Sequence, residues 1–126
     1  MAKKYYEEKR IKIPIYNQYL SLVITNKKDI SGRETYAHTY YDEGREQQLD
    51  SVLYLYINPF YKKQNITQGV IAHEAVHVVN RLFHHLGIYT EELNDEHQAY
   101  LVGWVVDEMN KFLKELKLNK KIKYEF

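Results

Sequence analysis

The chain has no cysteine, only two prolines and only five glycines among its 126 residues. The absence of cysteine excludes disulfide frameworks, thiol nucleophiles and cysteine-ligated zinc or iron–sulfur sites. A metal ion in this protein therefore takes histidine, aspartate or glutamate as ligands. Because proline and glycine interrupt strands and helices, their scarcity favours regular elements joined by few long linkers.

The chain also has no excess of charge of one sign. Its 18 lysines and arginines nearly cancel its 17 aspartates and glutamates, so no basic field attracts nucleic acid or anionic lipid. No segment approaches the run of about 18 apolar residues that marks a transmembrane helix, and the first ten residues lack a secretory signal pattern. We therefore expect no nucleic-acid partner, no membrane association and a cytoplasmic location, which is the host cytoplasm if the protein is virus-encoded. The oligomeric state is left open.

Tyrosine is abundant, at 13 residues, and it is common in strands. Four runs have the character of strands, at about residues 10–15, 19–25, 35–41 and 51–57. The run at 51–57 is apolar nearly throughout and is expected inside the sheet, whereas the more polar run at 35–41 is expected at an edge. Pro14 cannot donate to a strand ladder, so the first run is predicted to be short or at an edge.

Two helices are expected after the strands, because the apolar period changes from two to about 3.6. The first covers about residues 66–86, with Asn65 or Thr67 as its N-cap and Gly87 just past its C-terminal end. The second covers about residues 91–118. The sequence thus predicts a single α+β domain over residues 1–126, with a mixed sheet of about four strands followed by two packed helices.

The first helix contains the motif that carries chemistry, His73-Glu74-Ala75-Val76-His77. A spacing of four residues places the two imidazoles on one helix face, one turn apart, where both reach a single zinc ion. Glu74 is close enough to meet a water bound to that ion. A catalytic zinc needs a third protein ligand and an open position for water. The candidates for the third ligand are His84, His85, Asp95, Glu96 and His97.

The spacing of the motif, with eighteen residues between His77 and Glu96, resembles that of the gluzincin peptidases, including the aminopeptidase branch. The segment Glu96-His97-Gln98-Ala99 is similar to the second helix of small phage- or bacterium-encoded metallopeptidases. A metzincin pattern does not fit, because Asn80 and Phe83 occupy the places of its glycine and third histidine. The resemblance implies a zincin-like fold with one Zn²⁺ ion held by His73, His77 and Glu96.

The resemblance also implies zinc-dependent hydrolysis of peptide bonds. Glu74 would act as the general base that takes a proton from the water, and Tyr100 is the first candidate to steady the oxyanion, with His97 and Tyr89 behind it. A peptide or protein substrate is expected to lie along the strand at 35–41. The alternative is a catalytically inactive binding or regulatory protein with the same site.

Overall fold

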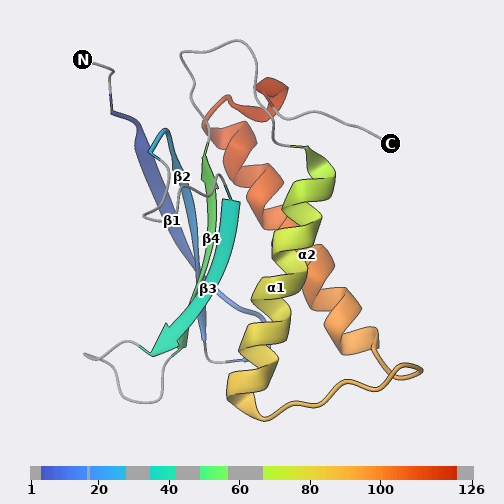
Figure 1. Cartoon of the computed structure of the whole chain (residues 1–126). Coiled ribbons are helices and arrows are strands. Elements are labelled where there is room, and N and C mark those ends of the chain that lie inside the picture. Colours follow the sequence, from blue (N-terminus) through green and yellow to red (C-terminus); the bar gives the residue numbers. More distant parts are fainter. Residues whose placement is uncertain (1–3, 17, 28–34, 42–48, 57–66, 122–126) are drawn as a thin grey trace.

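The computed structural model describes residues 4–16, 18–27, 35–41, 49–56 and 67–121 (Figure 1). Its elements, in chain order, are β1 (Tyr6–Lys12), β2 (Tyr19–Thr25), β3 (Thr35–Tyr41), β4 (Leu49–Tyr56), α1 (Gln68–Leu86), α2 (Glu96–Glu115) and a short 3-10 helix η1 (Asn119–Lys121).

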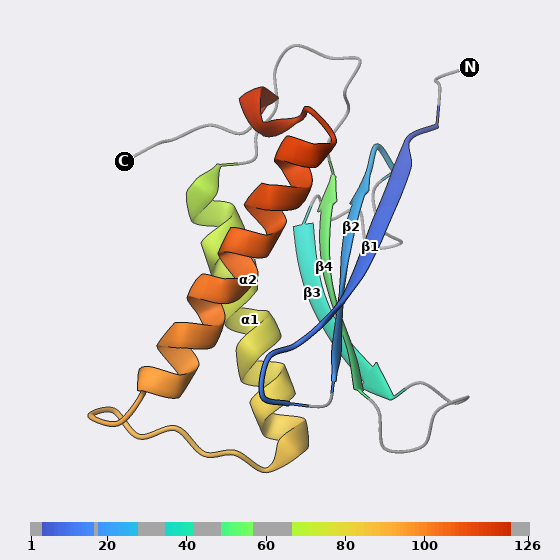
Figure 2. The ribbon, with the colours of Figure 1, turned by 180° about the vertical axis from the view of Figure 1, so that it is seen from behind.

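The strands form one sheet in the order β1-β2-β4-β3. The pairs β1/β2 and β3/β4 are antiparallel, and β2/β4 is parallel. β4 therefore lies inside the sheet and β3 at its edge, as the polarity of the two segments predicted. Both helices cover the same face of the sheet (Figures 1 and 2), with α1 in contact with β3 and β4.

The first strand differs from the one predicted at about residues 10–15. It begins at Tyr6 and ends at Lys12, so Pro14 lies beyond it. The N–H of Ile13 donates to the carbonyl oxygen of Gln18 at 2.9 Å, which closes the connection to β2. Ile15 has a φ of 72°, so the chain leaves the extended conformation where the alternation of isoleucines suggested that it continues.

The ends of α1 follow from its sequence. The Thr67 side chain accepts a hydrogen bond from the N–H of Val70 at 3.1 Å, so Thr67 is the N-cap, while Asn65 lies outside the described residues. Gly87 has a φ of 71°, and its N–H donates to the carbonyl oxygen of His84. The N–H of Ile88 closes the same turn onto Phe83 at 2.9 Å. Thr67 as the N-cap, which was one of the two alternatives, and Gly87 at the C-terminal end are thus confirmed.

The second helix is shorter than the predicted range of about 91–118. Before it, the N–H of Asn94 donates to the carbonyl oxygen of Glu91 at 3.0 Å, which forms a turn in place of the first helical turn. Asp95 is the N-cap residue but makes no side-chain cap hydrogen bond. At the other end, Lys117 adopts a φ of 60° and ends the helix in a left-handed conformation.

The core lies between the sheet and the two helices. β2 contributes Leu20, Leu22 and Ile24 to it, all of which are fully buried. Helical residues at spacings of three and four belong to the same cluster. They are Ile71, Ala75, Val78, Val79, Leu82 and Phe83 from α1, and Leu101, Val105, Met109, Phe112 and Leu113 from α2.

Polar contacts fix how the two helices align. At one end Gln68 and Asn110 exchange two amide hydrogen bonds of 2.7 and 3.0 Å. At the other end the Gln98 amide donates to the Asn80 side chain. Residues late in α1 thus meet residues early in α2, so the helices are antiparallel. These contacts also fix which side of α2 faces α1.

The fold class predicted from the sequence, a zincin-like α+β fold with a glutamate-bearing second helix, is wrong. That class requires the second helix to present Glu96 to the histidines of the first. Here Gln98 faces α1, and Glu96, about 200° away around the helix, lies on the opposite side. Within the described ranges, no three His, Asp or Glu side chains are grouped so that they could hold a metal ion.

None of the helices in the described part of the chain combines the length and apolar character needed to cross a membrane.

Candidate functional site

His73 and His77 lie together on the outward face of α1. Their Nε2 atoms are 3.2 Å apart, and the ring centroids are 4.8 Å apart with the ring planes at 77°. His73 is exposed and His77 is half-buried, so solvent reaches the pair. The structure therefore brings together the two residues that the motif predicted to act together.

The spacing of the two nitrogens fits a shared metal ion. Two nitrogen ligands at about 2.05 Å from a tetrahedral zinc ion stand about 3.3 Å apart. The observed 3.2 Å is within about 0.1 Å of that value. The same distance allows an N–H···N hydrogen bond between two neutral rings when no ion is bound.

Glu74 lies between this pair and the core. It is only 8% exposed, and it is the one charged residue among the buried residues of α1. Its position is about 100° around the helix from His73, on the side that packs against the sheet. The carboxylate thus lies at the boundary between the core and the helix face that carries His73 and His77.

The structure does not bring Glu96 to the histidine pair. Glu96 is the first residue of α2 and is exposed. Phe83, in the last turns of α1, stacks on the His97 ring with centroids 5.3 Å apart. The start of α2 therefore lies beside the end of α1, and His77 lies more than one turn earlier along α1. The role of Glu96 as a ligand stays a prediction.

Tyr100 also lies apart from the pair. Like Glu96 it is about 200° from Gln98 around α2, so it faces away from α1, and it is 62% exposed. Of the two weaker candidates, the Tyr89 side chain is 91% exposed in the connection between the helices, and His97 is held against Phe83. Within the described ranges, His97 does not join the His73–His77 pair in a group that could hold a metal ion.

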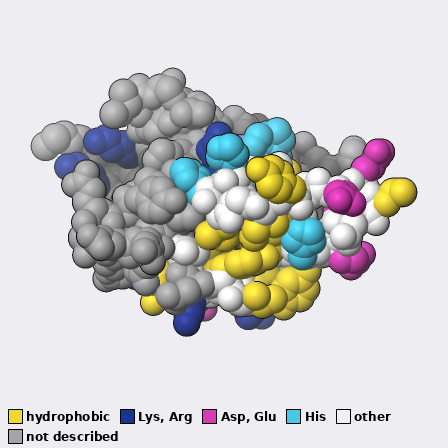
Figure 3. All heavy atoms as spheres, turned by 90° about the horizontal axis from the view of Figure 1, so that it is seen from below, with side chains coloured by type: hydrophobic (Ala, Val, Ile, Leu, Met, Phe, Trp, Pro, Cys, Tyr) yellow, Lys and Arg dark blue, Asp and Glu magenta, His cyan; other side chains and the backbone are white. Residues whose placement is uncertain are grey.

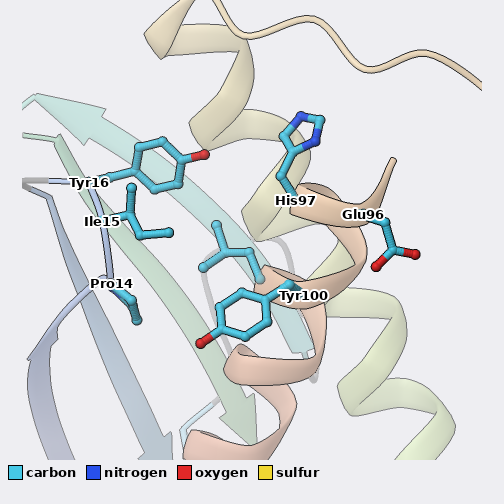
Figure 4. Close-up of a pocket in the computed structure, with 7 residues that line it drawn as sticks. Pro14, Ile15, Tyr16, Glu96, His97 and Tyr100 are labelled. Carbon is cyan, nitrogen blue, oxygen red and sulfur yellow. The ribbon is translucent and has the colours of Figure 1, made fainter. Parts of the chain in front are cut away.

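Glu96 and Tyr100 instead line a pocket of about 350 Å³ that the sequence did not predict (Figure 4). Its other lining residues are Pro14, Ile15, Tyr16, His97 and Leu101. In Figure 4 the rings of Tyr16 and Tyr100 stand on opposite sides of the cavity, while the Glu96 carboxylate points away from Tyr16. The signal that was available in the sequence is Pro14, because proline is common at the second position of a turn and cannot donate to a strand ladder.

The end of the molecule that carries this pocket is apolar. Seen from below, histidine side chains border an area of apolar side chains, and acidic side chains lie towards one end (Figure 3). Several large apolar residues are exposed in this region, namely Ile15, Tyr89, Leu93 and Tyr100. His84 and His85 lie near the C-terminal end of α1, with their ring centroids 5.9 Å apart. The helix dipole stabilises positively charged side chains at this end.

Comparison of the chain with models of protein families, with curated proteins and with solved structures gives no match.

Proposed function

We propose that the protein is a zinc-dependent hydrolase of peptide bonds, with His73 and His77 as metal ligands and Glu74 as the general base. The observation that carries the proposal is the 3.2 Å separation of the two Nε2 atoms on an exposed helix face. A cytoplasmic location and a peptide or protein substrate belong to the same proposal.

Each of the chain's own residues has a defined task in this reaction. His73 and His77 would hold the ion. A zinc ion held there would supply a bound water of lowered pKa and a Lewis acid for the scissile carbonyl. Glu74 accepts the proton of the attacking water and donates it to the leaving amine. Its burial beside the sheet keeps the carboxylate in one place next to the pair.

The sheet edge supports a peptide as the substrate. β3 is an edge strand, and α1, which carries the motif, packs against it. Among the described strands β3 pairs only with β4, and an extended peptide would add itself to the other edge of β3. The substrate's backbone would then run past the helix that holds Glu74.

The experiment combines metal binding with cleavage of a library of unstructured peptides. We expect the protein to bind zinc and to cleave, and Glu74→Gln to bind zinc while losing at least a hundredfold in cleavage rate, because general-base catalysis contributes about 10²–10⁴. His73→Ala should lose the metal. Glu92→Gln and His84→Ala are the matched controls, since both residues are exposed outside the pair, and both variants should behave as the parent.

Two outcomes contradict parts of the proposal. Cleavage by Glu74→Gln at the parental rate refutes the general-base role. A parent protein that binds no divalent metal refutes the metal site. Glu96→Ala decides the third ligand: lost affinity makes Glu96 a ligand after movement of the first turn of α2, whereas unchanged affinity leaves that position to water.

A metal-binding or regulatory protein without turnover is the second candidate. One observation favours it, namely that no third His, Asp or Glu in the described part of the chain stands with His73 and His77. Zinc binding without cleavage of any peptide in the library would establish this alternative.

A further inference from the structure

The outward face of α2 combines an exposed glycine, an exposed tyrosine and a shallow hollow, and one of its residues, Trp104, also packs against the core. Residues at spacings of three, four and seven fall within about 100° of one another on the side opposite the core. They are Glu96, Tyr100, Gly103, Trp104, Asp107, Lys111 and Lys114, and we call them the α2 stripe. In Figure 2 no other helix or strand of the described chain lies over α2.

Gly103 is the first unusual feature of the stripe. It is exposed in the middle of a helix, its φ is not positive, and a Cβ added there would meet nothing within 4 Å. Neither backbone conformation nor packing within the described chain therefore calls for glycine, although glycine weakens a helix interior. A glycine on an exposed helix face permits the close approach of another helix.

Tyr100 and a hollow on the same stripe are the second feature. Tyr100 projects from the helix with 62% of its surface exposed. A shallow hollow of about 420 Å³ begins one turn later. It is lined by Trp104, Asp107, Glu108, Asn110, Lys111 and Lys114. The centre of the hollow lies about nine or ten residues from Tyr100, roughly 15 Å along the helix axis.

The charges of the stripe are the third feature. Glu96 stands at its start and Lys114 at its end, while Asp107 and Lys111 lie between them and Lys111 pairs with Glu108 at 3.3 Å. This polarity also suits the helix dipole, but the dipole accounts for neither the glycine nor the hollow. An antiparallel copy of the same stripe presents lysines to Glu96 and glutamate to Lys114.

We infer that the α2 stripe is the contact surface of a symmetric homodimer, in which α2 packs antiparallel against α2 of a second copy. A two-fold axis near residue 105 places Glu96 of each copy opposite Lys114 of the other. It also places each Tyr100 beside residues 110 and 111 of the other copy, in the hollow of that copy. Gly103 lies close to the axis, where the two helix backbones approach most closely. A projection and a matching hollow on one face are what a two-fold contact requires.

This inference is independent of the proposed function, because the stripe lies on the opposite side of α2 from α1 and its histidines. The association is therefore measured on protein treated with a chelator, which removes any metal-bridged contact. Sedimentation velocity over a wide range of concentrations should show a reversible species of twice 15.2 kDa. A protein that stays monomeric at millimolar concentration overturns the inference.

Trp104 provides a direct probe, since it is the only tryptophan in the chain and lines the hollow. Its fluorescence emission should shift to shorter wavelength as the concentration rises through the dimerisation range. An emission maximum that does not move while dimers form places the contact elsewhere and refutes the stripe.

Gly103→Gln separates the contact from the stability of the helix. The substitution should weaken dimerisation at least tenfold while the thermal midpoint of the dilute monomer stays the same or rises, because glutamine is the better helix former. Val76→Gln, at an exposed position of α1, is the matched control and should leave dimerisation unchanged. Full dimerisation of Gly103→Gln contradicts the close approach at this residue.

The antiparallel arrangement has a charge-reversal test. Glu96→Lys and Lys114→Glu should each dimerise at least tenfold more weakly than the parent, since each copy then opposes like charges. An equimolar mixture of the two variants should restore association, because both contacts of the mixed dimer join opposite charges. A mixture that associates no better than the separate variants refutes the antiparallel pairing.

Discussion

Ile15 offers a test of backbone strain that side-chain contacts scarcely complicate. Its φ of 72° lies in the left-handed region, where a β-branched residue is a clear outlier. Its side chain is 90% exposed, so replacing it removes little buried surface. The residue follows Pro14, and a proline followed by a positive φ is typical of a type II turn, in which glycine or asparagine is preferred.

The expected gain follows from two opposing terms. The left-handed conformation costs an L-residue roughly 1–2 kcal/mol, and glycine costs roughly 0.5–1 kcal/mol more than other residues to order on folding. Ile15→Gly should therefore raise the free energy of unfolding by about 1 kcal/mol. For a chain of this length such a change raises Tm by roughly 3–6 °C.

Urea unfolding followed by circular dichroism measures this difference at equilibrium. Ile15→Ala is the control, because it removes the exposed side chain but keeps the Cβ that conflicts with the backbone, and its stability should stay within about 0.5 kcal/mol of the parent. Ile15→Asn should gain stability, as asparagine tolerates the left-handed region. If Ile15→Gly is less stable than the parent, or Ile15→Ala gains as much as Ile15→Gly, the strain argument is refuted.

Three further predictions concern the ends of elements and one titration. Lys117→Gly should raise the free energy of unfolding by about 0.5–1 kcal/mol in thermal melts, because the φ of 60° that ends α2 suits glycine, whereas Lys120→Gly should not. Thr67→Ala should lower it by about 1 kcal/mol through loss of the cap bond to Val70, and Thr67→Ser should restore most of it, so an alanine variant as stable as the parent excludes this cap. Burial, and secondarily the Glu7 charge, raise the pKa of Tyr5 above its ordinary value, so the unfolded state loses this proton first and stability falls as the pH rises above about 10. Alkaline unfolding curves of Tyr5→Phe should show a weaker pH dependence, and an unchanged dependence contradicts the raised pKa.

The sequence predicted best the features that depend on neighbouring residues. The spacing of His73 and His77 placed them on one helix face, and Gly87 marked the end of that helix, because both depend only on the period and capping of one helix. The inner and edge positions of two strands were also predicted, since a buried strand is apolar on both faces.

Prediction from the sequence failed where one local residue pattern is compatible with more than one backbone conformation or helix orientation. Ile11, Ile13 and Ile15 alternate as in a strand, yet Ile13 is 2% exposed and Ile15 is 90% exposed, because the chain turns after Lys12. Periodicity contains no information on that turn apart from Pro14.

The rotation of α2 about its own axis was the other failure, and it decides the site. The eighteen residues between His77 and Glu96 fit a second helix turned either way about its axis. The structure turns Gln98 towards α1, through its bond to Asn80, and leaves Glu96 on the far side. The hydrogen bond between Gln98 and Asn80, which no sequence pattern indicates, thus turns Glu96 away from His73 and His77.

The place of α2 in the chain has a consequence for synthesis. α2 follows every strand, yet its buried residues, with Val105 and Met109 in the middle, complete the core over β2. The ion pair of 2.8 Å from Lys9 to Glu115 joins β1 to the last turn of the same helix. Because chains emerge from the ribosome N-terminus first, the sheet and α1 leave with an apolar face open to water. Until residue 113 has emerged, the nascent chain is a target for chaperones and for association with other nascent chains.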